Sequence, residues 1–74
     1  MDYNIQMTWD REAAVWVATS DDVPGLALES GSFDALIERV KYAVPELMEL
    51  NHRNDSAYHL NFCSKRNDVV VANG

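Results

Sequence analysis

One apolar stripe at helical spacing, between residues 33 and 50, limits the fold of this chain more than any other feature. Apolar side chains recur there at steps of three and four, as in an amphipathic helix of about five turns. The members of the stripe are Phe33, Leu36, Ile37, Val40, Ala43, Val44, Leu47 and Leu50. A helix of this kind buries its stripe against a second layer, which the rest of the chain has to supply.

Local signals mark the start of this helix and an interruption within it. Ser32 is a suitable N-cap, and Asp34 places negative charge in the first turn, where the helix dipole favours it. Pro45 lies inside the stripe and removes the hydrogen bond to the carbonyl of Lys41. We therefore expect the helix to kink or split at Pro45.

Four shorter segments have the alternation or the composition of β-strands. Residues 3–9 alternate without a break and place Tyr3, Ile5, Met7 and Trp9 on one face. The other segments are residues 14–19, apolar on both faces as in a central strand, residues 26–29, which follow a Pro-Gly turn, and residues 58–63.

These elements predict an α+β fold in the order βββαβ, an antiparallel sheet with one Pro-kinked helix packed on one face. Residues 1–63 form the predicted domain and residues 64–74 a C-terminal tail. Within the tail, residues 69–72 suit a short fifth strand, an edge that pairs with another chain, or a mobile end. The pattern leaves all three open.

The size of the chain and its single cysteine bear on what stabilises it. A domain of 74 residues buries a modest core, and Cys63 alone cannot form an internal disulfide. We therefore expect a reducing, cytoplasmic location and support from a homo-oligomer or another partner. The first residues lack the pattern of a signal peptide, and the apolar run at residues 13–18 is too short to span a bilayer.

The charge is negative and unevenly distributed. The net charge is −6, and residues 1–50 contain ten acidic and three basic side chains, a balance of −7. Residues 51–74 have three bases and two acids, a balance of +1. Such a surface repels a phosphate backbone and attracts a basic protein, so no nucleic-acid binding is expected. The alternative is that the acidity only keeps the protein soluble.

No set of residues has the pattern of a catalytic or metal site. His59 is four positions from Cys63, which on a strand is about 13 Å, too far to activate a nucleophile. Cys63 is therefore predicted to be an ordinary, half-buried thiol. The two histidines and one cysteine lack zinc-ligand spacing, and the three glycines are isolated. We expect no enzyme activity, no cofactor and no metal.

Acidic turns and one tryptophan are the candidates for contact with a partner. The two tryptophans suit RNA stacking or, because acids flank them, core and interface anchoring. The predicted partner-binding residues are Asp10, Glu12, Trp16, Asp21 and Asp22. The alternative is that the acids are solvated turn residues.

Motifs in a fixed order resemble the N-terminal domain of HicB-type antitoxins and a short HicB-like family of uncharacterised proteins. They are Trp9-Asp10-Arg11-Glu12-Ala13-Ala14-Val15-Trp16-Val17-Ala18, Asp22-Val23-Pro24-Gly25, Ser30-Gly31-Ser32, and the helix Leu36 to Leu50 with Ala43-Val44-Pro45-Glu46-Leu47. The resemblance implies a partial RNase H-like fold without catalytic carboxylates. It also implies an antitoxin that masks a small basic mRNA interferase of HicA type.

Two departures from the HicB pattern limit this expectation. Leu26 stands where many HicB sequences have cysteine, and only residues 64–74 follow the last strand, too few for the DNA-binding domain of full-length antitoxins. The alternative function is an orphan homodimer with a structural or regulatory role and no toxin partner.

Overall fold

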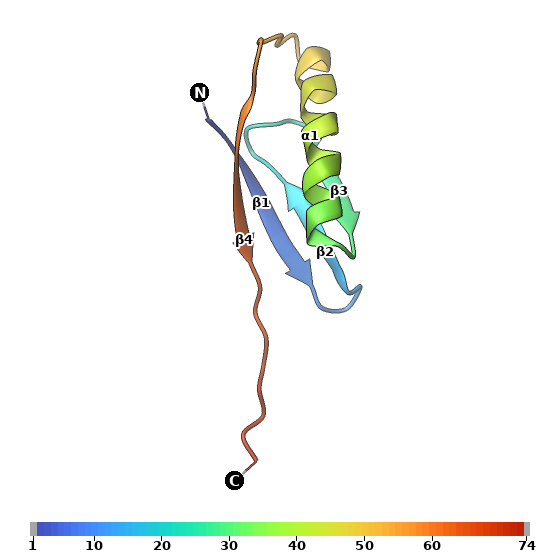
Figure 1. Ribbon diagram of the computed structural model, residues 1–74, viewed down its shortest axis with the longest axis vertical. Coiled ribbons are helices and arrows are strands. Elements are labelled where there is room, and N and C mark those ends of the chain that lie inside the picture. Colours follow the sequence, from blue (N-terminus) through green and yellow to red (C-terminus); the bar gives the residue numbers. More distant parts are fainter. Residues whose placement is uncertain (1, 74) are drawn as a thin grey trace.

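A computed structural model describes residues 2–73, which form two layers, a sheet and one helix (Figure 1). The elements follow the predicted order βββαβ. They are β1 (Asp2–Asp10), β2 (Val15–Thr19), β3 (Ala27–Ser30), α1 (Phe33–Leu50) and β4 (His59–Lys65). The α+β class and the single covering helix are thereby confirmed.

The four strands form one mixed sheet in the order β3-β2-β1-β4. β1 pairs antiparallel with β2, and β2 pairs antiparallel with β3. β4 instead runs parallel to β1, with Asp2 opposite His59 and Thr8 opposite Lys65. The expectation of a purely antiparallel sheet was wrong for this strand. α1 carries the chain back to the end where β1 begins, so β4 enters the sheet in the direction of β1.

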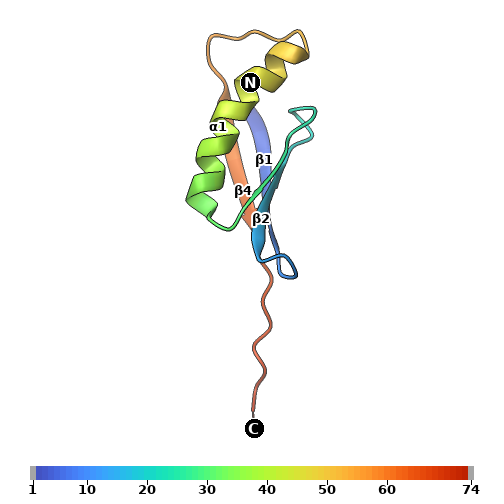
Figure 2. The ribbon, with the colours of Figure 1, turned by 90° about the vertical axis from the view of Figure 1, so that its right-hand side faces the viewer.

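The core lies between α1 and one face of the sheet (Figure 2). The alternation in β1 buries Tyr3, Ile5 and Met7 as predicted, whereas Trp9 is half-buried at the end of the strand. The remaining buried residues are Ala18, Val23, Leu26, Leu36, Val40, Val44 and Met48. No described element covers the opposite face of the sheet, which is therefore open to solvent or to a partner.

α1 begins as predicted and continues through its proline. The Ser32 hydroxyl accepts a hydrogen bond from the amide of Ala35 at 3.2 Å, which confirms the N-cap. The helix is uninterrupted at Pro45, so the predicted split was wrong. Val44 and Met48, on either side of the proline, are both buried. Their packing keeps the two halves in one continuous helix despite the missing hydrogen bond. α1 bends in its second half (Figure 2), as a kink at a proline would produce.

Two tyrosines attach the α1–β4 connection to the first strand. Tyr3 donates from its hydroxyl to Asp55 Oδ2 at 3.2 Å and accepts from Arg53 Nη2 at 3.1 Å. The rings of Tyr3 and Tyr58 meet edge to face with 5.7 Å between their centroids. The Tyr58 hydroxyl in turn accepts from the amide of Asp55 at 3.0 Å. These contacts of Tyr3 and Tyr58 align the start of β4 with the start of β1.

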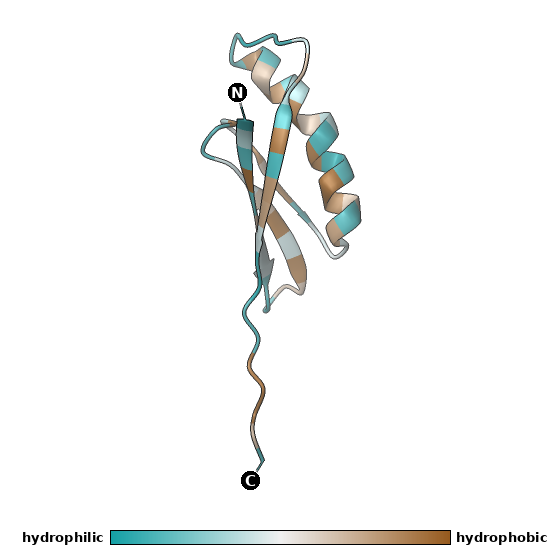
Figure 3. Cartoon of the chain, turned by 60° about the vertical axis from the view of Figure 1, so that its left-hand side comes forward, coloured by the Kyte–Doolittle hydropathy of each residue, from teal (hydrophilic) through white to brown (hydrophobic). Residues whose placement is uncertain are grey.

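Residues 66–73 continue beyond β4 as an extended segment without helix or strand (Figures 1 and 2). The segment is largely hydrophilic near β4 and apolar farther along (Figure 3). Its apolar part is Val69, Val70 and Val71, which are 71%, 91% and 84% exposed. These residues therefore do not form a fifth strand in the sheet of their own chain.

Within the described residues, no helix is both long and apolar enough to cross a membrane.

Candidate protein-binding surfaces

The tip of the β1–β2 hairpin is held by one aspartate. Asp10 pairs with Val15 at the end of the ladder, and its Oδ1 accepts hydrogen bonds from the amides of Glu12 at 3.0 Å and Ala13 at 3.2 Å. Ala14 closes the turn with a φ of 54°. The Asp10 carboxylate thus has a local role in the turn, while the Glu12 side chain makes no hydrogen bond in the described structure and is exposed.

Three aromatic rings and one guanidinium group form an aromatic cluster next to this tip: Trp9, Trp16, Phe33 and Arg66. The Trp16 ring meets Trp9 at 5.4 Å and Phe33 at 4.8 Å, both edge to face. The guanidinium of Arg66 lies 4.2 Å from the Trp9 ring centroid, within cation–π range. The two tryptophans are half-buried, and Trp16 packs against the core. Arg66 was not foreseen from the sequence, because no local pattern links residues this far apart.

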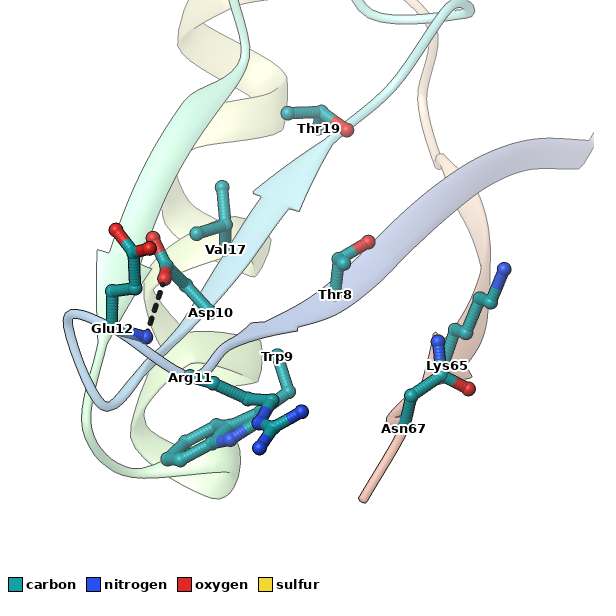
Figure 4. Close-up of a pocket in the computed structure, with 9 residues that line it drawn as sticks. All are labelled: Thr8, Trp9, Asp10, Arg11, Glu12, Val17, Thr19, Lys65 and Asn67. Carbon is teal, nitrogen blue, oxygen red and sulfur yellow. Dashed lines mark hydrogen bonds between the residues drawn. The ribbon is translucent and has the colours of Figure 1, made fainter. Parts of the chain in front are cut away.

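A shallow depression of about 790 Å³ lies beside the hairpin (Figure 4). Its floor includes Thr8, Val17 and Thr19, which lie on the uncovered face of the sheet. The charged side chains around it are Asp10, Arg11, Glu12 and Lys65. Two acids and two bases give this depression a mixed charge, so it is not by itself an acidic site.

The predicted contact residues fall into two groups at opposite ends of the sheet. Asp10, Glu12 and Trp16 lie at the hairpin end, whereas Asp21 and Asp22 lie in the β2–β3 loop. The structure therefore does not bring all five residues together.

Within the β2–β3 loop, the two aspartates differ. Asp22 is half-buried and its Oδ2 accepts from the amide of Asn4 at 2.8 Å, which extends the contact between the loop and β1. Asp21 is exposed and makes no side-chain hydrogen bond in the described structure. Asp21 is therefore available to a partner, while Asp22 already has a role inside the fold.

Reactive side chains are spread along the surface. Cys63 is exposed rather than half-buried, because it lies on the uncovered face of the edge strand β4. Across residues 2–73, no three His, Cys, Asp or Glu side chains gather closely enough to hold a metal ion.

Burial raises the pKa of the Tyr3 phenol above its ordinary value of 10.0. The hydrogen bond to Asp55 raises this pKa further, while the positive charge of Arg53 lowers it.

Among residues 2–73, most of the acidic side chains have no ion-pair partner. Three ion pairs occur in the described part of the chain, Glu38–Lys41 at 3.3 Å, Arg53–Asp55 at 3.9 Å and Arg66–Asp68 at 2.9 Å. Of the twelve acids and six bases of the chain, nine acids and three bases therefore lie outside these pairs. The negative charge read from the sequence remains largely uncompensated in the fold.

Comparison with known proteins places the chain among proteins of similar fold. A family described as a domain of unknown function, DUF1902, matches residues 2–72. The crystal structure of hypothetical protein TTHA1013 from the extremely thermophilic bacterium Thermus thermophilus is 39% identical, with a TM-score of 0.81. The match covers 95% of this chain and 100% of that chain. A search of the curated proteins gave no match.

Proposed function

The chain belongs to the DUF1902 family, a domain of unknown function, and from that premise we propose that it is a protein-binding module for a small basic protein. The observation that carries the proposal is the excess of carboxylates outside the ion pairs of residues 2–73, nine against three bases. Unpaired surface charge of one sign steers a partner of the opposite sign and selects against partners of the same sign.

The resemblance to HicB-type antitoxins gives this partner a chemical identity. A HicA-type mRNA interferase is small and basic because it binds RNA, and an acidic protein can occupy the surface that the phosphate backbone needs. In this proposal the chain acts without catalysis, by covering that surface. Glu12 and Asp21 are the proposed contact residues, because they are exposed and make no side-chain hydrogen bonds within the chain.

The test is inhibition of a purified HicA-type mRNA interferase from the same genome by the purified chain. We expect RNA cleavage to stop near one equivalent of the chain, and the affinity to fall as NaCl rises from 50 to 300 mM, roughly tenfold or more for several ionic contacts. Continued cleavage at tenfold excess, together with no complex by light scattering, would contradict the proposal.

Matched charge variants separate the proposed contacts from net charge. The double variant Glu12→Gln with Asp21→Asn removes one charge from each of the two proposed contact sites, which lie at opposite ends of the sheet. The double variant Glu46→Gln with Glu49→Gln removes two charges from exposed positions near the end of α1. The first pair should weaken toxin binding several-fold more than the second. Equal effects would mean that the overall charge, and not these residues, directs the binding.

A further inference from the structure

The two edges of the sheet differ in how they are protected. β3 is four residues long, and Arg39 of α1 donates from Nη1 to its Glu29 carbonyl at 2.7 Å. β4 is seven residues long and pairs only with β1, so its outer edge has no strand beside it in residues 2–73. An unprotected edge of this length presents backbone donors and acceptors to another strand.

The side of β4 that faces α1 is also incompletely covered. α1 packs closest to β2 and β3. Leu60 and Phe62 of β4 are therefore half-buried, whereas their neighbours on β1, Tyr3 and Ile5, are buried. A depression of about 380 Å³ lies between α1 and the start of β4, lined in part by Val44, Pro45, Tyr58 and Leu60. A strand added to this edge would place side chains over these apolar groups.

The same chain supplies a segment that lacks a partner. Val69, Val70 and Val71 are β-branched, extended and the most exposed run of large apolar residues in the described structure. They follow β4 in the same direction and point away from the domain, so they lie along no edge of their own sheet (Figures 1 and 2). At the start of this segment, Arg66 is fixed against Trp9.

We propose that two copies of this chain pair through the outer edges of β4, antiparallel about a two-fold axis, with each valine segment running along β4 of the other copy. An isologous contact of this kind satisfies the open edge and the unpaired segment of both copies at once. A second copy needs no further partner for this, because it brings its own valine segment to the open edge. The inference rests on the edge and the tail, and it is independent of the charge-based binding proposed above.

Strand alternation decides which valine enters the apolar contact. Leu60 and Phe62 face α1, so in a continuous strand the even-numbered Val70 faces the same side. An axis at Ser64 places Val70 opposite Tyr58 of the second copy, and an axis at Lys65 places it opposite Leu60. Both are half-buried apolar residues packed against the core. Val71 faces the uncovered side in either register.

The test compares two variants that carry the same new charge on opposite faces. Light scattering of the full chain should give twice 8.4 kDa at about 100 μM. Val70→Asp should raise the dimer dissociation constant tenfold or more, and Val71→Asp clearly less. Both residues are exposed in the single chain, so circular dichroism should show an unchanged fold in each variant.

The exposed Cys63 gives a second readout without any new cysteine. In the two registers the Cys63 Cα atoms of the two copies lie about 8–14 Å apart, from strand spacing alone. A short bis-maleimide should therefore link the wild-type chain into a covalent dimer and link Val70→Asp poorly. A monomer at 100 μM would overturn the proposal. So would a dimer that both aspartate variants leave intact, since its interface would have to lie elsewhere.

Discussion

The phenol of Tyr3 joins the buried core to a polar surface pair. Tyr3 is 2% exposed, while its hydroxyl forms hydrogen bonds with Asp55 and Arg53, whose side chains are about half exposed. The pKa of the phenol is raised by burial, so the folded state favours the protonated form. The pKa of the phenol is therefore higher in the folded chain than in the unfolded chain. This difference stabilises the folded chain at pH values below the unfolded-state pKa, and the stabilisation is lost as the pH rises through the folded-state pKa.

We predict that the free energy of unfolding of the wild-type chain falls as pH rises above 10.0, the ordinary pKa of the phenol. Tyr3→Phe removes this ionisation along with the two hydrogen bonds. The variant should be less stable at pH 7 but should lose less stability between pH 9 and 11. Urea unfolding at each pH measures both effects, and parallel pH profiles of the two proteins would contradict this role of Tyr3.

Single residues with strong backbone preferences could be placed from the sequence. At the predicted Pro-Gly turn, Gly25 adopts a φ of 86° after Pro24, and the Leu26 amide donates to the Val23 carbonyl at 3.2 Å, as in a type II turn. The N-cap at Ser32 was also predictable, because its hydrogen-bond partner Ala35 is only three positions away. The contacts of Tyr3 with Asp55 and of Arg66 with Trp9 were not predictable, because their partners are 52 and 57 positions apart and meet only in the assembled sheet.

At the level of elements, α1 shows how packing outweighs a local helix breaker. The apolar stripe predicted the extent of the helix well, from Phe33 to Leu50. Of the two outcomes expected at Pro45, a kink or a split, the split was wrong, because buried residues on both sides of the proline anchor both halves of one continuous helix. The direction of β4 was also missed. A strand pattern gives no information on whether its neighbour runs parallel or antiparallel, since both have a period of two.

We predict that Pro45→Ala stabilises the chain by about 1–3 kcal/mol, since it restores the amide donor for the Lys41 carbonyl and removes the ring clash. Urea unfolding at pH 7 measures the change. The matched variant Glu46→Ala, also on the exposed side of α1, should stay within about 0.5 kcal/mol of the wild type. No gain for Pro45→Ala would mean that the proline ring contributes packing beside Tyr58 that offsets its backbone cost.

For the whole molecule, the dominant physical property is uncompensated negative charge. The fold brings few opposite charges together, as its three ion pairs show. The negative net charge could be predicted from composition alone, but the location of a binding site could not. The five predicted contact residues fall into two groups at opposite ends of the sheet, and two of them, Asp10 and Asp22, accept hydrogen bonds from the backbone of their own chain.

We predict that NaCl stabilises the folded chain, because it screens the mutual repulsion of the excess negative charges, which lie closer to one another in the folded chain than in the unfolded one. Raising NaCl from 20 to 500 mM at pH 7 and fixed protein concentration should increase the free energy of unfolding by up to about 1 kcal/mol. The quadruple variant with neutral amides at positions 12, 21, 46 and 49 should show a smaller increase. An equal salt effect in that variant would assign it to something other than these acids.

The parallel pairing of β4 with β1 also affects the order in which the protein can fold. The Asn61 side chain of β4 donates a hydrogen bond to the Asn4 side chain of β1, 57 positions away in the sequence. The pairing of β4 with β1 therefore forms only after all the residues between them are available. Contacts this distant in sequence slow folding, because a long loop must be closed before they form. During synthesis on the ribosome, β1, β2, β3 and α1 emerge first and leave β1 as a temporary edge of the sheet. Until residues 59–65 arrive, that edge is where a nascent chain is open to mispairing with its neighbours.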